Sequence, residues 1–238
     1  MSLWASLQSL IGQATSGAGA ALGALVDRLR NLVGDEEQRR QVAFTVAMIG
    51  LSAKMAKADG VVTNEEIDAF RDLVEFPQGE AENVARLYNL AKQDVAGFDA
   101  YARKIASLFE GEDAILEDIL DGLFHIAMAD GVLHDREAAY LQTVASEFGM
   151  DEVEYKRVRA RHVFEGDLDP YAVLGVDSDL PYDDVRRVYR RLVAENHPDR
   201  LIARGVPQEF IKIASERLAA INSAFDQIEL RHRGVPTA

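Results

Sequence analysis

The residues of this chain whose types and spacing best suit chemistry are His197, Pro198 and Asp199, which stand together in one tripeptide. Four arginines precede it at helical spacing: Arg186, Arg187, Arg190 and Arg191. A carboxylate beside a row of guanidinium groups can bind a partner protein that offers an acidic groove and a nearby arginine. The sequence shows no nucleophile paired with a base and no metal-ligand spacing. These patterns predict a partner-binding site without catalytic residues, metal or cofactor, in a chain that is not an enzyme.

Two amphipathic helices are needed to position this tripeptide. The first is predicted at 182–195, where apolar side chains recur at helical spacing and the arginines fall on the solvent face. Pro198 fixes its own φ angle and moves His197 out of the α region, so this helix has to end there. A second helix is predicted at 208–229. Together they form a helical hairpin that carries the tripeptide, called the tip, in the connecting loop.

Four motifs in the C-terminal region follow one another in a fixed order. They are DPYAVLGV at 169–176, VYRRL at 188–192, HPDR at 197–200 and LAAINSAF at 218–225. This order resembles the J domain of DnaJ-type co-chaperones, and the insert LIARGVP at 201–207 is similar to that of DjlA-type membrane-anchored J proteins. Asp169 is expected to cap a short helix that has Pro170 in its first turn.

The resemblance also implies a partner for the tip. That partner is a DnaK-type chaperone. Asp199 of this chain would reach a charged network of the chaperone, near its nucleotide domain and its linker. The tip and the four arginines would dock on this chaperone and speed its ATP hydrolysis, and no catalytic group of the J-like region is required.

The preceding part of the chain, from Glu36 to Val163, is predicted as successive helices because no strand-like alternation occurs in it. The segments AKADGVV at 56–62 and AMADGVL at 127–133 repeat one another, and Glu66 and Glu137 follow at the same offset. Asp135 is expected to cap the helix after the second copy. Two related helical units about a pseudo-two-fold axis are therefore predicted, and they resemble the TerB-like, tellurite-resistance type of domain that DjlA-like proteins carry.

The Asp-Gly turn with a later glutamate also has the spacing of part of a calcium-binding loop. However, the first and third ligand places would be Met55 and Lys57 in one copy and Ile126 and Met128 in the other. Calcium needs oxygen ligands at those places, so a plain helix turn is favoured. An alternative function stays open on the acidic surface. It is a metal- or stress-responsive TerB-like binding protein in which the J region serves mainly as a tether.

Composition sets broader limits. The chain has no cysteine, which excludes disulfides and thiolate metal sites. Its formal net charge of −14 argues against nucleic-acid binding, and most of that charge lies before residue 169. His125 lies on an apolar stretch at 114–129, and we expect it to be packed or interfacial rather than a ligand.

The first 26 residues carry no charge and allow three interpretations: a membrane anchor, an amphipathic surface helix or a flexible segment. Gly19 and Gly23 form a small-xxx-small pattern, which suits close helix contact and therefore a dimer through this segment. The DjlA resemblance favours association with the inner membrane, and Arg28 and Arg30 would keep the bulk of the chain on the cytoplasmic side.

The predicted fold is all-α, with a TerB-like helical domain that contains an internal pseudo-repeat, followed by a J-domain helical hairpin. The expected boundaries are an anchor or flexible segment at 1–30, the TerB-like region at 31–163, a linker at 164–168 and the J-like region at 169–238. The predicted function is that of a J-domain co-chaperone in which the TerB-like region serves for sensing or targeting. The expected location is cytoplasmic or on the cytoplasmic face of the inner membrane.

Overall fold

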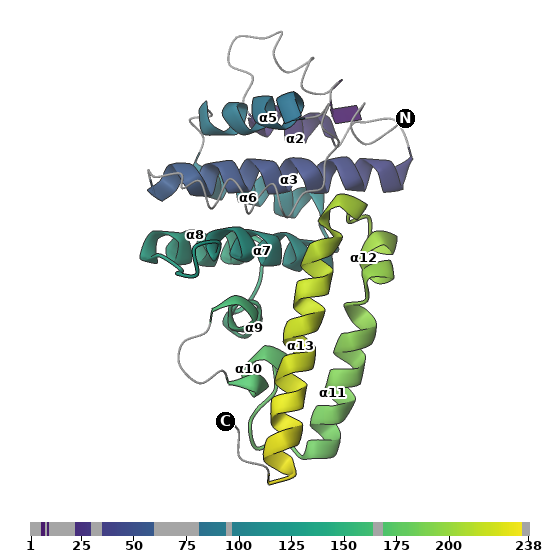
Figure 1. The fold of residues 1–238 in the computed structure, drawn as a ribbon. Coiled ribbons are helices and arrows are strands. Elements are labelled where there is room, and N and C mark those ends of the chain that lie inside the picture. The colour runs from purple at the N-terminus through teal and green to yellow at the C-terminus, as the bar shows by residue number, and fades with distance from the viewer. Residues whose placement is uncertain are drawn as a thin grey trace.

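The all-α prediction is confirmed by a computed structural model, which describes residues 6, 7, 9, 22–29, 35–59, 81–93, 97–163 and 169–234. Those residues form helices and turns without a strand. Figure 1 shows the helices of the TerB-like region stacked in layers, with a long hairpin crossing their edge. The candidate site lies where the hairpin meets these layers.

The centre of the TerB-like region is helix α3 (Glu36–Asp59), which is buried on every side from Val42 to Ala56. Such a helix has to be covered all round. In Figure 1, α2 (Leu22–Leu29) and α5 (Ala81–Gln93) lie on one side of it, and α7 (Asp113–Ala127) and α8 (Asp135–Glu147) lie on the other. Helix α6 (Phe98–Leu108) also contacts α3.

Two buried tyrosines fix the helices around α3. Tyr101 of α6 donates its hydroxyl to the carbonyl of Val46 at 2.9 Å, and Tyr140 of α8 donates to the carbonyl of Leu51 at 2.8 Å. A buried tyrosine hydroxyl needs such a hydrogen-bond partner. Each of the two bonds therefore fixes α6 or α8 at a defined residue along α3. Burial also raises the pKa of the Tyr140 hydroxyl well above its usual value.

The start of α8 differs from the expectation. The prediction that Asp135 caps this helix is wrong, because His134 is the N-cap residue and Asp135 is the first helical residue. The buried carboxylate of Glu137 accepts a hydrogen bond from the backbone N–H of His134 at 3.0 Å, which satisfies a donor at the helix start. The corresponding turn of the first copy, at 60–66, lies outside the described residues, so the pseudo-two-fold arrangement stays a prediction.

The hairpin of the J-like region is confirmed. Helix α10 (Pro170–Leu174) begins after Asp169, whose carboxylate accepts from the backbone N–H of Tyr171 at 3.0 Å as expected. The arms of the hairpin are α11 (Tyr182–Glu195), which has the predicted bounds, and α13 (Ile211–His232). A short helix, α12 (Pro198–Arg204), and a 3₁₀ turn at Gln208–Phe210 connect them, where the sequence predicted a loop.

The hydrophobic cores do not divide where the two regions meet in sequence. The distal part of the hairpin has a core of its own, in which Tyr189 of α11 and Phe225 of α13 stack at 3.9 Å between ring centroids. The part near the tip belongs to the core of the TerB-like region instead, through Leu201, Val206, Phe210, Ile213 and Ala214. The expected linker at 164–168 lies outside the described residues.

Candidate functional site

The tip is exposed and held in a defined backbone conformation. His197 is the N-cap of α12, and its Nδ1 accepts a hydrogen bond from the backbone N–H of Asp199 at 3.3 Å. The side chains of His197 and Asp199 are 54% and 86% exposed, so both are open to a partner.

Pro198 has two effects at this position. It ends α11, as the sequence predicted, and it also occupies the first turn of α12. Proline suits this place because its φ angle is already helical and its missing N–H would find no partner there. The tip is therefore the start of a helix rather than an irregular loop, and its backbone is correspondingly rigid.

The four predicted arginines lie on the exposed face of α11. Val185 and Leu192 occupy its buried face, which confirms the amphipathic pattern. Arg187 pairs with Asp184, and Arg191 Nε lies 4.0 Å from Glu195 Oε1. Exposed pairs of this kind contribute at most about 1 kcal/mol, so the guanidinium groups can exchange these local carboxylates for those of a partner at little cost.

A buried asparagine ties the tip to the rest of the molecule. The Asn196 side chain donates to the carbonyl of Leu192 at 2.8 Å and accepts from Arg217 Nη1 at 2.9 Å. Asn196 directly precedes His197. Its amide therefore fixes the end of α11 and the start of the tip on α13.

Arg217 is the centre of an ion cluster that the sequence interpretation missed. Its side chain is 2% exposed, and it lies between Asp118 and Asp121 of α7, whose side chains are 0% and 1% exposed. Arg217 Nε donates to Asp121 Oδ2 at 2.5 Å, and Nη1 lies 2.6 Å from Asp118 Oδ1. A signal was present in the sequence: Arg217 falls between Ile213 and Ile221 on the apolar face of its helix.

The two aspartates differ in their partners and in the direction of their pKa shifts. Asp121 also contacts His162 Nε2 at 2.9 Å and Arg161 Nη1 at 3.4 Å. Burial opposes the charge of Asp121, but these neighbours and Arg217 outweigh it and hold its pKa well below the usual value. At Asp118 burial outweighs the guanidinium groups of Arg217 and Arg204, which lie 2.6 and 3.6 Å away, and raises its pKa.

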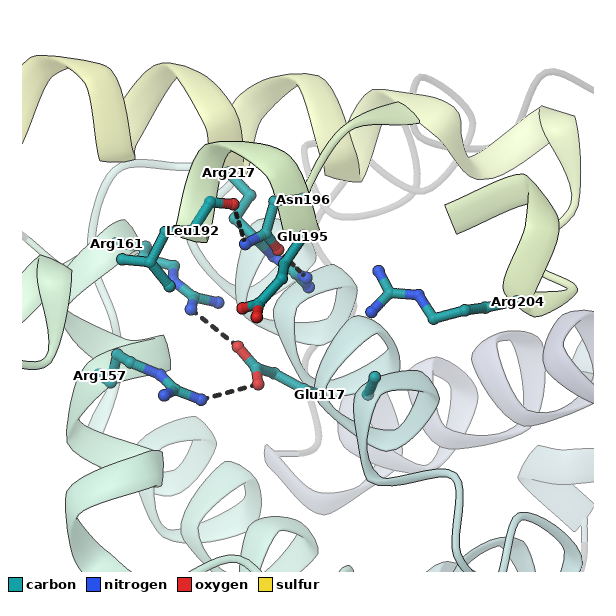
Figure 2. Close-up of a pocket in the computed structure, with 9 residues that line it drawn as sticks. Glu117, Arg157, Arg161, Leu192, Glu195, Asn196, Arg204 and Arg217 are labelled. Atoms are coloured by element: carbon teal, nitrogen blue, oxygen red, sulfur yellow. Dashed lines mark hydrogen bonds and ion pairs between the residues drawn. The ribbon is translucent and has the colours of Figure 1, made fainter. Parts of the chain in front are cut away.

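A pocket of about 200 Å³ lies beside this cluster, between α7, α9 (Glu152–His162) and the tip end of the hairpin. Figure 2 shows Arg157 and Arg161 of α9 pointing toward Glu117, whose oxygens they meet at 2.8 and 2.7 Å. Asn196 and Arg217 line the same pocket. The ion cluster is therefore continuous from the TerB-like region to the residue before the tip.

His125 is interfacial, as expected, because its Nδ1 lies 2.5 Å from Glu216 Oε2 of α13. In the part of the chain that the structure describes, no three His, Cys, Asp or Glu residues are grouped so that they could hold a metal ion. Within those same ranges no helix is long and apolar enough to span a membrane. Most of segment 1–30 lies outside them, so its anchoring and dimerisation stay predictions.

Comparison with known proteins bears on the whole chain. Residues 45–160 match the family described as tellurite resistance protein TerB. Over 218 residues the chain is 29% identical to the co-chaperone protein DjlA of Photobacterium profundum, covering 80% of this chain and 78% of the relative. It is 26% identical to the DjlA co-chaperone of Photorhabdus laumondii over 268 residues, which cover 96% of this chain and 98% of that protein. No solved structure matches the chain.

Proposed function

The chain is a J-domain co-chaperone of the DjlA type with a TerB-like domain, and from this premise we propose that its tip docks on a DnaK-type chaperone and stimulates ATP hydrolysis there. The partner-binding residues in this proposal are those of the tip, His197, Pro198 and Asp199, and the arginines of α11: Arg186, Arg187, Arg190 and Arg191. The TerB-like region serves as the sensing or targeting module.

The observation that carries this proposal is the exposure of the tip on a rigid support. Asp199 presents an 86% exposed carboxylate at the first turn of α12. The arginines of α11 are exposed as well, so the hairpin offers both a carboxylate and several guanidinium groups to solvent. Such a mixed surface can meet a partner's arginine and its acidic groove at the same time.

In this proposal the partner chaperone carries out the ATP hydrolysis, and the tip only binds it. Asp199 is a single exposed carboxylate, and His197 uses Nδ1 to cap the backbone of α12. Binding therefore acts by changing the conformational equilibrium of the chaperone, which requires that the tip bind one of its states more tightly than the other.

The substitution Asp199→Asn tests this proposal. It removes the charge with almost no change of shape, and we expect it to abolish the stimulation of single-turnover ATP hydrolysis by the DnaK-type chaperone. Helix content, measured by circular dichroism, should stay unchanged because the side chain is exposed. The matched control is Asp179→Asn, which makes the same change at an exposed position before α11. Full stimulation by the Asp199→Asn protein would refute the proposed docking.

A further inference from the structure

We infer that Asp121 and Arg217 are positioning residues for the tip. The TerB-like region therefore supports the docking residues and holds them in the conformation that binds the partner. The consequence for chaperone stimulation rests on the function proposed above. The positioning itself is a property of this chain and can be measured without a partner.

The first step is a continuous series of hydrogen bonds from α7 to the tip. Asp121 Oδ2 accepts from Arg217 Nε at 2.5 Å, and Arg217 Nη1 donates to Asn196 Oδ1 at 2.9 Å. Asn196 Nδ2 then donates to the carbonyl of Leu192 at 2.8 Å. Three helices are joined in this way: α7 of the TerB-like region, and α13 and α11 of the hairpin. His197 follows Asn196 directly, so its backbone starts from a fixed point.

The second step concerns the other end of the tip. Helix α12, which begins with Pro198, packs Leu201 into the core of the TerB-like region, and Val206 follows it there. Phe210 meets Phe44 of α3 edge to face, with 5.0 Å between the ring centroids. The tip is therefore held between two attachments, the hydrogen-bonded Asn196 before it and the apolar contacts of α12 after it.

A glycine allows this close contact. Gly205 ends α12 with φ at 95°, and a Cβ added there would lie 2.8 Å from Cβ of Arg40 on α3. A residue without a side chain is thus needed both for the backbone angle and for the approach to α3. The end of α12 rests directly on the central helix of the TerB-like region.

The third step is energetic. A hairpin separated from the TerB-like region would leave Arg217 without Asp118 and Asp121, and would leave these two carboxylates without their cation. Water would then hydrate the separated charges, so the ion pairs themselves add little net free energy to docking. The apolar residues of α12 would also become exposed, since they are not part of the distal core of the hairpin. The docked arrangement is therefore the stable state of the chain.

The docked arrangement supports the tip and does not cover it. His197 and Asp199 stay exposed in the docked arrangement, and so do the arginines of α11. A blocking role for the TerB-like region would instead require its helices to lie over these groups. The contacts therefore predict that weakening the Asp121–Arg217–Asn196 link lowers partner binding rather than raising it.

The test uses the full chain with Asp121→Asn, Asn196→Leu and both together. Each single substitution breaks the link at a different end, and each should speed hydrogen exchange of the backbone amides at 197–206. If the fraction of chains with a competent tip falls to about one tenth, the concentration that half-saturates chaperone stimulation should rise about tenfold, with the maximal rate unchanged. The double variant should be little worse than either single one, because both act on the same link.

Two controls separate positioning from general stability. Asn196→Asp keeps an oxygen facing Arg217 but loses the donor to the Leu192 carbonyl, so its exchange protection and affinity should lie between those of wild type and Asn196→Leu. Asp113→Asn changes an exposed carboxylate at the start of α7 and should alter neither. All variants are compared at a temperature where circular dichroism shows them fully folded.

Each result decides the inference. If Asp121→Asn lowers thermal stability but leaves tip exchange and half-saturation at the wild-type values, Asp121 is only structural and the inference is wrong. Additive losses in the double variant would likewise contradict a shared link. If the wild-type chain gives no stimulation at all, the proposed function fails, and hydrogen exchange alone then decides whether the tip is positioned from α7.

Discussion

Replacing the two buried aspartates of α7 one at a time should change the stability of the chain to very different extents, although both contact the same arginine. The two changes are Asp118→Asn and Asp121→Asn. We expect the second to be strongly destabilising and the first to be nearly neutral. The reason lies in how far the surroundings compensate each charge.

The loss at Asp121 can be estimated from its contacts. The carboxylate accepts from Arg217 Nε at 2.5 Å and from His162 Nε2 at 2.9 Å, with Arg161 Nη1 at 3.4 Å. An amide in its place removes the charge and turns one acceptor into a donor that faces other donors. Breaking a buried pair from one side costs about 3–5 kcal/mol. We expect about 3 kcal/mol, the lower end of that range, because Asp118 still lies beside Arg217.

At Asp118 the cost of burying the carboxylate is large relative to the gain from its contacts. Its burial is complete, and its charge is compensated by one short contact, the 2.6 Å ion pair with Arg217 Nη1, with Arg204 Nη2 at 3.6 Å. The substitution Asp118→Asn removes the cost of burying a charge, and it also removes the ion pair with Arg217. Removing a poorly compensated buried charge is often neutral or stabilising, so we expect a change of less than about 1 kcal/mol.

The pH dependence follows from the directions of the two pKa shifts. The pKa of Asp121 is lowered in the folded chain, so its stabilisation is present above the unfolded value of about 3.9 and is lost as pH falls below it. The pKa of Asp118 is raised, so its favourable contribution is present below the unfolded value and is lost as pH rises through the folded pKa. The Asp118→Asn chain should therefore compare best with wild type at neutral pH.

The assay is urea unfolding followed by circular dichroism at pH 7, repeated at several pH values down to pH 3, with thermal unfolding in parallel. For a chain of this size 3 kcal/mol corresponds to about 6–12 °C in Tm. The difference between wild type and Asp121→Asn should shrink in acid. Equal losses for the two variants at pH 7, or a larger loss for Asp118→Asn, would refute this assignment of charge within the cluster.

Two further predictions concern the surface and the interface. Replacing Arg187 and Arg191 by Glu should slow association with the chaperone about tenfold at low salt. The effect should be much smaller at high salt, because salt screens the attraction between surface charges. Equal association rates of the wild-type and variant chains at low salt would exclude a role for these arginines. Gly205→Ala should lower the free energy of unfolding, measured by urea titration, by about 1–3 kcal/mol. A residue with a Cβ is strained at a φ of 95°, and this Cβ would lie 2.8 Å from Arg40 Cβ. An unchanged midpoint of urea unfolding would mean that α12 does not rest on α3.

Local features of the hairpin were predictable because they depend on neighbours in sequence. The apolar spacing in 182–195 and the proline after it gave the bounds of α11, and Asp169 before Pro170 gave the start of α10. The same kind of reasoning failed at α12. It treated proline only as a helix terminator, whereas the residues after Pro198 are held in a helix by their contacts with a distant core.

The ion cluster was beyond local reasoning for a different reason. Arg217 and Asp121 stand 96 residues apart, and helical periodicity places each on a face without naming its partner. The position of Arg217 between two isoleucines showed that a charge would be buried. It did not show which carboxylates would compensate that charge.

The sequence by itself determined the all-α class, the order of the two regions and the identity of the tip, because these follow from spacing, proline stereochemistry and motif order. Tertiary structure decided how the tip is held. Packing places α12 in the core of the TerB-like region and brings α7, α13 and Asn196 together around one buried arginine. A buried charge must find its counter-charge wherever the folded chain supplies it, and that choice is made in three dimensions.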